Sequence, residues 1–242
     1  MRDSIAARGA WQGGRLGRAL IAAEAEVLAG ALDDVFGQEL LQVGCWGRGH
    51  ELLACSRIRR QTVLGSCLET AAGGADLIAS LDRLPVASGV VDAVVLPHSL
   101  EFELDPYAVV READRVLGGE GQLLVLGFRP FSLWGLRAAA TPAGFPPGLR
   151  RTLSEGRLRD WLVLLGYEIV SSRRYLYRLP LEPGGPGDAP GPNPLRWGLF
   201  NPLPASAYLL KARKRIYTAT PIRPRALRER LRVIGGLAEP TA

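Results

Sequence analysis

Cysteine, histidine and long apolar runs are scarce in this chain of 242 residues, and each shortage argues against a class of protein. The three cysteines are an odd number and form no C-x-x-C pair, so the sequence indicates neither a disulfide framework nor a zinc site. Reduced thiols fit a cytoplasmic location best. With only two histidines, the sequence offers no Ser-His-Asp or Cys-His arrangement for nucleophilic catalysis, and no metal is expected.

No unbroken apolar run reaches the length of a membrane-spanning helix. The N-terminal segment carries arginines and is rich in alanine and leucine, but Glu24 and Glu26 interrupt it. Those two charges argue against a secretory signal. We therefore expect a cytoplasmic protein without an integral membrane segment.

The residues that are abundant indicate one compact domain with a basic end. The chain is 47% hydrophobic and 22% charged, with a formal net charge of +6. These values suit a single globular domain. Much of the positive charge lies late, at residues 211–215 and 223–232. Such runs are often solvated tails, although they can also attract nucleic acid or anionic membrane.

Apolar runs and helix-period patterns alternate along the chain, which favours an α/β protein with a mostly parallel sheet. Strands are expected at residues 39–43, 61–64, 77–79, 92–96 and 122–126, with a final pair at 167–179 and 207–213. Helices are expected at residues 15–36, from the turn after the first strand to Ser56, at 105–117 and at 154–165. Asp105 is the expected N-cap of its helix and Pro106 the first helical residue. The segment between the final strands is dense in proline and glycine and is expected to be a loop.

The most specific pattern in the chain lies within residues 84–128. It reads Leu84-Pro85-Val86, then Asp92, then His98-Ser99-Leu100-Glu101, then Asp105-Pro106, then Glu112-Ala113-Asp114-Arg115-Val116-Leu117. This order and spacing resemble the second half of the class I S-adenosylmethionine (SAM)-dependent methyltransferases. The most similar branch is type 11, which includes the ubiquinone and menaquinone methyltransferases. The resemblance implies a Rossmann-like sheet, mostly parallel, with an antiparallel C-terminal hairpin at one edge.

The resemblance also implies a domain plan. The methyltransferase-like domain is expected at residues 38–215. An N-terminal helical segment at residues 1–37 is expected to pack on its core, and residues 216–242 are expected to be a basic, flexible tail. The oligomeric state is left open.

A glycine-rich turn after the first strand is the expected SAM site. The family pattern D/E-x-G-x-G-x-G lets the backbone approach the ligand, and the helix that follows presents free N–H groups to the methionine carboxylate. This chain has Gln42 in place of the acid, Gly44 as the first glycine and Trp46 in place of the second, so the spacing becomes G-x-x-G-x-G. The turn also fails the dinucleotide fingerprint G-x-G-x-x-G. The cofactor contacts implied here are Gln42, Gly44, Cys45, Trp46, Gly47 and Gly49.

Two further acids of the family pattern are missing. The strand at residues 61–64 ends in Gly65-Ser66, where an acid would hold the ribose, and Glu69 is a loose substitute. At the adenine position the chain has Ser80-Leu81-Asp82, with serine where the family has aspartate. Charge-assisted hydrogen bonds are worth about 1.5–3 kcal/mol each. We therefore expect SAM to bind more weakly than in a complete family site.

Several side chains near the expected site have two interpretations. Trp46 either fills space that a cofactor would take or stacks on adenine. His98, just past the fourth strand, is either a general base or a structural hydrogen-bonding group. Glu101 either binds a cationic substrate or caps a helix, and Asp92 is expected to support the strand. The aromatic loop at residues 127–137 includes Arg129 and Trp134, and it either lines a substrate pocket or packs on the sheet edge.

The function that the resemblance implies is methyl transfer from SAM to an unidentified acceptor, expected to be a small molecule. The alternative is a methyltransferase-like module that has lost catalysis and serves in binding or regulation. A nucleic-acid methyltransferase that uses the basic tail is a third hypothesis. It is disfavoured for base amino groups, because residues 96–99 read Leu-Pro-His-Ser and not Asn/Asp-Pro-Pro-Tyr/Phe.

Overall fold

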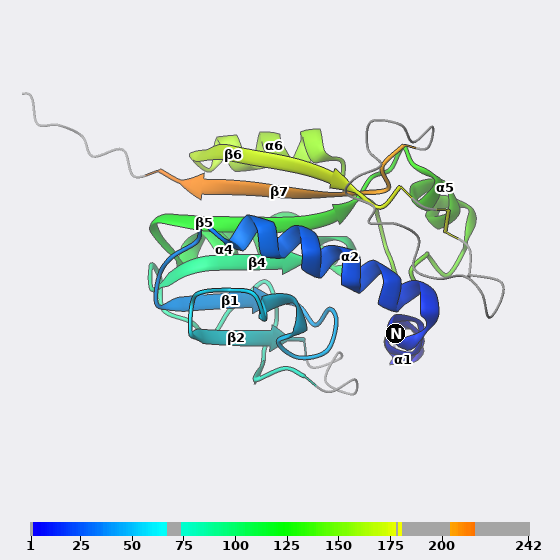
Figure 1. Ribbon diagram of the computed structural model, residues 1–242, viewed down its shortest axis with the longest axis horizontal. Coiled ribbons are helices and arrows are strands. Elements are labelled where there is room, and N and C mark those ends of the chain that lie inside the picture. The colour runs from blue at the N-terminus through cyan, green and yellow to red at the C-terminus, as the bar shows by residue number, and fades with distance from the viewer. Residues whose placement is uncertain (1, 67–73, 178, 181–203, 216–242) are drawn as a thin grey trace, which may run out of the picture.

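The computed structural model describes residues 2–66, 74–177, 179–180 and 204–215, and a seven-stranded sheet organises them (Figure 1). The strands are β1 (Glu39–Val43), β2 (Arg60–Gly65), β3 (Leu77–Ile78), β4 (Val91–Pro97), β5 (Leu117–Phe128), β6 (Tyr167–Tyr175) and β7 (Ala207–Lys214). Their order is β3-β2-β1-β4-β5-β7-β6, and β7 runs antiparallel to both β5 and β6. The other pairs are parallel, so the expected sheet with an antiparallel C-terminal hairpin is confirmed.

Two apolar cores lie on the two faces of this sheet. Along β4, Ala93 and Val95 belong to one core while Val94 and Leu96 belong to the other, as the alternation of side chains along a strand requires. Helices cover both faces, which is why the central strands read as continuous apolar runs. In Figure 1, α2 (Arg15–Leu32) crosses the first face, and α4 (Pro106–Val116) and α6 (Glu155–Leu164) lie on the second.

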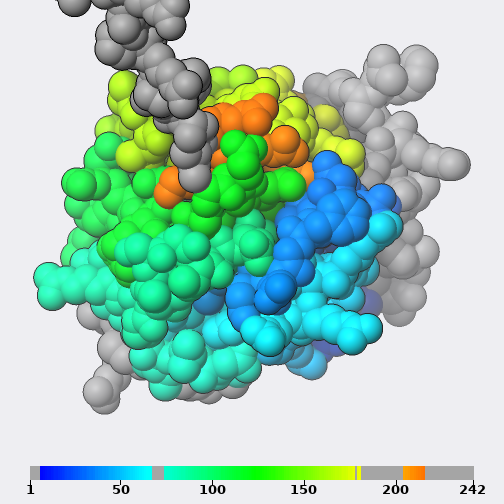
Figure 2. All heavy atoms as spheres, turned by 90° about the vertical axis from the view of Figure 1, so that its left-hand side faces the viewer, coloured from blue at the N-terminus to red at the C-terminus, as the bar shows by residue number. Residues whose placement is uncertain are grey.

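The N-terminal segment forms two helices that share a core with the sheet. The helix α1 (Arg2–Gly13) is followed at once by α2, which buries Leu20, Val27 and Leu28 against the first face. The chain between α2 and β1 is on the surface at the edge where the parallel strands begin (Figure 2). Asp92 braces this entry, because its Oδ2 accepts hydrogen bonds from the backbone N–H groups of Gln38 (2.6 Å) and Glu39 (3.0 Å). The domain boundary at residue 37 stays a prediction.

Helix caps are the part of the pattern that the sequence predicted best. Asp105 Oδ1 accepts from the backbone N–H groups of Tyr107 and Ala108, both at 3.1 Å, and Pro106 begins α4. Ser154 Oγ accepts from the N–H of Arg157 at 3.3 Å and caps α6. Two short helices, α3 (Ser99–Phe102) and α5 (Leu133–Ala140), follow β4 and β5. Among the described residues, no helix is long and apolar enough to cross a membrane.

Several expected boundaries are wrong. The helix expected at residues 15–36 ends at Leu32, and the strand expected from residue 122 begins at Leu117, where the backbone turns extended and pairs with Val91. The strand expected at residues 167–179 ends at Tyr175, because Leu176 adopts a positive φ of 63° just after β6. The tail and most of the Pro/Gly-rich loop lie outside the described residues.

The helix expected after the glycine-rich turn is replaced by one 3-10 turn, η1 (Glu51–Leu53). Gly47 and Gly49 have φ values of 78° and 51° in front of it. A left-handed backbone at these two positions delays the start of any helix. The structure therefore lacks the long helix dipole that the family pattern implies at this point, within the residues described.

Candidate functional site

The glycine-rich turn sits where the sheet changes direction. β1 neighbours β2 on one side and β4 on the other, so the end of β1 is the topological switch point at which such folds bind ligands. Gly44 has a φ of 101°, and a Cβ atom there would lie 2.4 Å from Ser99 Oγ. Ser99 Oγ donates to the carbonyl of Val43, and Gly44 N donates to the carbonyl of Leu64 at 2.7 Å. Only glycine fits this point, which is held to β2 through Leu64 and to the start of α3 through Ser99.

Gln42 braces the turn from within the sheet. Its side chain is fully buried, and Nε2 donates to the carbonyls of Gly44 (3.0 Å) and Trp46 (3.5 Å). Its Oε1 is buried without a hydrogen-bond partner. A buried acceptor without a partner carries a desolvation cost, so it marks a place where a donor is missing.

A cavity of about 650 Å³ opens between the turn, α1 and α2. Small side chains of α1 form one wall, and the charged side chains on the cavity are Arg18, Arg48 and Glu51. The backbone N–H of Arg48 donates to Glu51 Oε2 at 3.1 Å. Gly47 lines the cavity at its positive φ, whereas Cys45 is half-buried in the turn. The volume lies within the range of about 300–1,000 Å³ that is usual for small-molecule sites.

Trp46 lies in the protein interior, not on the cavity wall. The residue is 2% exposed, and its indole Nε1 donates to Glu24 Oε2 at 2.5 Å. Rings of Trp11, Phe102 and Phe128 surround it, with centroids 5.8–6.4 Å away. This packing favours the space-filling interpretation over adenine stacking, since stacking needs a free ring face.

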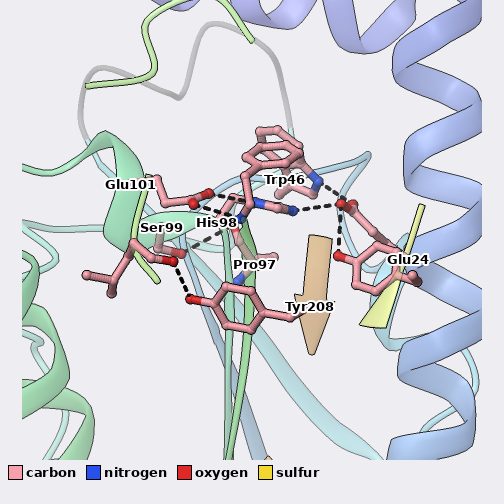
Figure 3. Close-up of polar contacts among 10 residues, drawn as sticks. Glu24, Trp46, Pro97, His98, Ser99, Glu101 and Tyr208 are labelled. Atoms are coloured by element: carbon pink, nitrogen blue, oxygen red, sulfur yellow. Dashed lines mark hydrogen bonds and ion pairs between the residues drawn. The ribbon is translucent and has the colours of Figure 1, made fainter. Parts of the chain in front are cut away.

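His98 is clamped between two carboxylates (Figure 3). It follows β4 directly, in the left-handed region at φ 57°, and its side chain is 0% exposed. Nε2 lies 2.7 Å from Glu24 Oε1 on α2, and Nδ1 lies 2.8 Å from Glu101 Oε2 on α3. The remaining oxygen of Glu101 accepts from the backbone N–H of Phe128 at 2.7 Å. The cluster therefore joins α2, the end of β4, α3 and the end of β5.

Charge balance in this cluster fixes the protonation of His98. Burial alone would lower the pKa of the imidazole, but Glu24 and Glu101 outweigh it and raise the pKa to about 9. Burial raises the pKa of Glu101, and contact with His98 opposes that shift. At neutral pH the imidazole is therefore a cation between carboxylates. A protonated imidazole has no lone pair to accept a proton, so this geometry suits a positioning role better than a general base.

The adenine-side residues are near one another but differ in exposure. Ser80 Oγ donates to Asp82 Oδ1 on the surface, and Leu81 is buried in the second core. Glu69 lies outside the described residues. Asp76, which the sequence interpretation missed, accepts from the N–H of Val63 at 2.7 Å and pairs with His50 at 3.0 Å. Its backbone hydrogen bond to Val63, together with His50, lowers its carboxyl pKa.

The three expected substrate residues also differ in exposure, and two of them, Trp134 and Glu101, are buried. Trp134 is 1% exposed and stacks on Phe128 with centroids 5.6 Å apart, so it belongs to the aromatic core. Arg129 is half-buried and donates from Nη1 to the carbonyl of Ala205 at 3.1 Å. Glu101 faces His98 and not an open cavity. Over the described ranges, no group of three or more His, Cys, Asp or Glu residues is placed to hold a metal ion.

Glu24, Arg48 and Glu51 were missed by the sequence interpretation, and only Glu24 had a signal in the sequence. It interrupts the apolar face of α2, four residues after Leu20 and three before Val27. An acid at such a position costs free energy unless it is paired. A buried partner was therefore to be expected, although its identity was not.

Comparison with known proteins finds one family and several distant relatives. Residues 41–125 match the type 11 family model described as a methyltransferase domain. The chain is 38% identical over 100 residues to the uncharacterized protein YafS of Escherichia coli, which covers 38% of this chain and 39% of YafS. It is 31% identical over 196 residues to the uncharacterized protein Rv2003c of Mycobacterium tuberculosis, which covers 74% and 63%. The chain thus spans less than two thirds of either relative.

Solved structures with the same fold share little sequence. A SAM-dependent methyltransferase of Thermotoga maritima aligns with a TM-score of 0.56 and 15% identity, over 81% of this chain and 89% of that one. A chain from the complex of the Haloferax volcanii Trm112 methyltransferase activator with a methyltransferase gives 0.64 and 16%, over 90% and 98%. The [4+2]-cyclase SpnF gives 0.52 and 20%, over 80% of each. At these identities the likeness establishes the fold alone.

Proposed function

Because the chain carries a methyltransferase domain of the type 11 family in a class I fold, we propose that it is a SAM-dependent methyltransferase. The observation that carries this proposal is the cavity of about 650 Å³ beside the glycine-rich turn, which follows β1 at the switch point of the sheet. The acceptor is unidentified, and a small molecule remains the proposed class.

The residues around this cavity fit the amino-acid end of SAM. That end carries a carboxylate and an ammonium group, and the cavity presents Arg18 and Arg48 for the first and Glu51 for the second. Gly44, Gly47 and Gly49 would bring the backbone close to the ligand. The exposed Ser80 and Asp82 would face its adenosine end, whereas the side chain of Leu81 is buried in the second core.

The chemistry asks little of the protein beyond binding and positioning. When bound, SAM supplies a methyl group that its sulfonium already activates. The chain's own contribution is to orient the acceptor and exclude water. Trp46, Phe128 and Trp134 pack in a buried aromatic cluster next to the ends of β1 and β5. His98 as a cation would hold this cluster in place through Glu24 and Glu101, and an acceptor that must lose a proton would need another base.

Titration of the purified protein with S-adenosylhomocysteine tests the proposal. We expect saturable heat by calorimetry and a concentration-dependent rise in melting temperature, because a ligand that binds only the folded state stabilises it. The affinity should be weaker than that of a site with all its acids. If neither signal is seen at millimolar ligand, the proposal of SAM-dependent catalysis is wrong.

The buried position of Trp46 favours a second candidate, a methyltransferase-like module without catalysis. The fold alone does not decide, since SpnF shares it and is described as a cyclase. Titration of Trp46→Gly with S-adenosylhomocysteine separates the candidates. If the indole blocks the site, this change should tighten binding, and if it stacks on adenine, binding should weaken by about 1–3 kcal/mol. Binding by the variant but not by the natural chain would support the inactive module.

A further inference from the structure

Two adjoining hollows lie on the surface beside α6, apart from the cavity at the glycine-rich turn. One has a volume of about 630 Å³ and the other about 400 Å³. They share Pro130, Phe131 and Ser154, so they form one continuous groove. Its walls are the loop after β5, the start of α4, the segment at residues 150–154 and the first turns of α6.

Arginine dominates the charge of this groove. Six arginines line it: Arg129, Arg150, Arg151, Arg157, Arg159 and Arg174. Only two acids accompany them, Asp105 and Glu155, which leaves a formal surplus of four positive charges. Glu155 accepts from Arg159 (3.3 Å) and Arg174 (3.2 Å) and so holds two of the guanidinium groups in place. A concave surface with such an excess of positive charge attracts polyanions.

Aromatic rings alternate with these charges. Phe131 is 88% exposed at the point where the two hollows meet. Tyr107 and Trp161 pack edge to face at 5.3 Å, and the guanidinium of Arg157 lies over the Trp161 ring at 5.4 Å. An exposed phenylalanine gains nothing in water, but it offers a face on which an unpaired base can stack.

The groove is fastened to the candidate site. The backbone N–H groups of Arg150 and Arg151 donate to the carbonyl of Glu101 at 3.1 and 3.3 Å, and the carboxylate of the same residue binds His98. Pro130 and Phe131 follow β5 within three residues of Phe128, whose N–H binds Glu101. A chain that is bound in the groove would therefore pass beside the carboxyl ends of β4 and β5.

We propose that this arginine groove binds a single strand of nucleic acid, with the arginines on its phosphates and Phe131 stacked against a base. Arginine and exposed aromatic side chains in one channel are the two elements that single-strand binding requires. The phosphate backbone and base faces are common to RNA and DNA, so either strand is a source of this ligand. This inference goes beyond the proposed methyl transfer and does not depend on it.

Fluorescence anisotropy of the full-length protein tests the groove, with labelled U20 RNA and dT20 DNA as probes and no SAM present. The double change Arg150→Gln with Arg157→Gln should raise Kd for both probes about tenfold or more at low salt. The slope of log K against log salt should fall by about 0.7 for each phosphate that the variant no longer neutralises. The control pair Arg59→Gln with Arg83→Gln removes the same charge from exposed positions elsewhere, and should change Kd less than about twofold.

Phe131→Ala separates stacking from simple charge attraction. The ring is exposed, so the fold should be unaffected, while Kd for U20 rises at least about fivefold and Kd for a 20-base-pair duplex stays the same. Equal losses in the groove and control pairs, or no binding of U20 by the natural chain, would overturn the proposal. So would a groove pair that alters binding only to phosphatidylserine vesicles, or salt-dependent U20 binding that neither groove variant changes, which would point to residues 216–242.

Discussion

The two halves of the sheet are built differently. β4 to β7 have 7, 12, 9 and 8 residues, whereas β1 to β3 have 5, 6 and 2. The longer half also carries capped helices α4 and α6, while the glycine-rich turn of the shorter half leads into a single 3-10 turn. The half with the stronger family pattern is thus the scaffold, and the half that would hold the cofactor depends on contacts with it.

Besides the parallel pairing of β1 with β4, buried side-chain contacts tie the two halves together. Ser99, at the start of α3, donates to the carbonyl of Val43 at the end of β1, and Glu24 joins His98 to the indole of Trp46 in the turn. The cluster of Glu24, Trp46, His98 and Glu101 is here called the joint, because it connects α2 and the glycine-rich turn to the ends of β4 and β5. Changes at the joint should cost stability, and changes on the cavity wall should cost only ligand affinity.

The largest expected effect comes from breaking the joint at Glu24. Glu24→Ala removes one of the two carboxylates of His98 and the acceptor of Trp46, and a buried ion pair that loses one partner typically costs about 3–5 kcal/mol. Glu26→Ala is the matched control on the exposed side of α2 and should change stability by less than about 0.5 kcal/mol. Urea unfolding measures both. Equal midpoints for the two variants would show that the cluster is not the joint.

The second prediction uses pH. The pKa of His98 is about 9 in the folded protein against 6.5 for the free side chain. The stability that this shift contributes is complete below pH 6.5 and lost as pH rises through 9. The shift corresponds to about 3 kcal/mol of unfolding free energy at most. The raised pKa of Glu101 acts in the same direction. A carboxyl with a higher pKa in the folded state than in the unfolded state also makes the folded protein less stable as pH rises.

Unfolding free energies measured from pH 6 to 9.5 should therefore decline, and His98→Gln should flatten the decline. A profile that rises over this range in the natural chain would mean that His98 is neutral in the fold. In that case the general-base role would return as the better interpretation.

The sequence predicted the helices of the longer half of the sheet better than that of the shorter half. Asp105, Pro106 and the apolar stripe of α4 are local signals, and the helix and its cap formed as expected, although β5 begins earlier, at Leu117. The contact between Glu24 and His98 spans 74 residues, so no local pattern could reveal it. The prediction of a helix after the glycine-rich turn was wrong for a different reason. Positive φ at Gly47 and Gly49 replaced an expected helix, and the sequence reports that glycine is present but not how its backbone turns.

A third, smaller effect is expected at the turn itself. Gly44→Ala forces a side chain into a φ of 101° with its Cβ 2.4 Å from Ser99 Oγ, and such strain costs about 1–3 kcal/mol. Gly156→Ala on α6 is the control, because nothing lies within 4 Å of a Cβ there. That change should stabilise by up to about 1 kcal/mol. The melting temperature should fall in Gly44→Ala and rise in Gly156→Ala. A change of the same sign in both variants would contradict the close approach of Gly44 and Ser99.

The smallest effect should leave the joint intact and touch only the cavity. Arg48 is one of the cavity's two arginines, and in the proposed site it binds the carboxylate at the amino-acid end of SAM. Arg48→Gln should weaken S-adenosylhomocysteine binding by about 1.5 kcal/mol, the lower value for a charge-assisted hydrogen bond, with no change in melting temperature. 5′-Methylthioadenosine lacks that end, so its affinity should be the same in both proteins, and Arg59→Gln should change neither. An equal loss for both ligands would mean that Arg48 acts on the shape of the turn, and that the amino-acid end of the cofactor lies elsewhere.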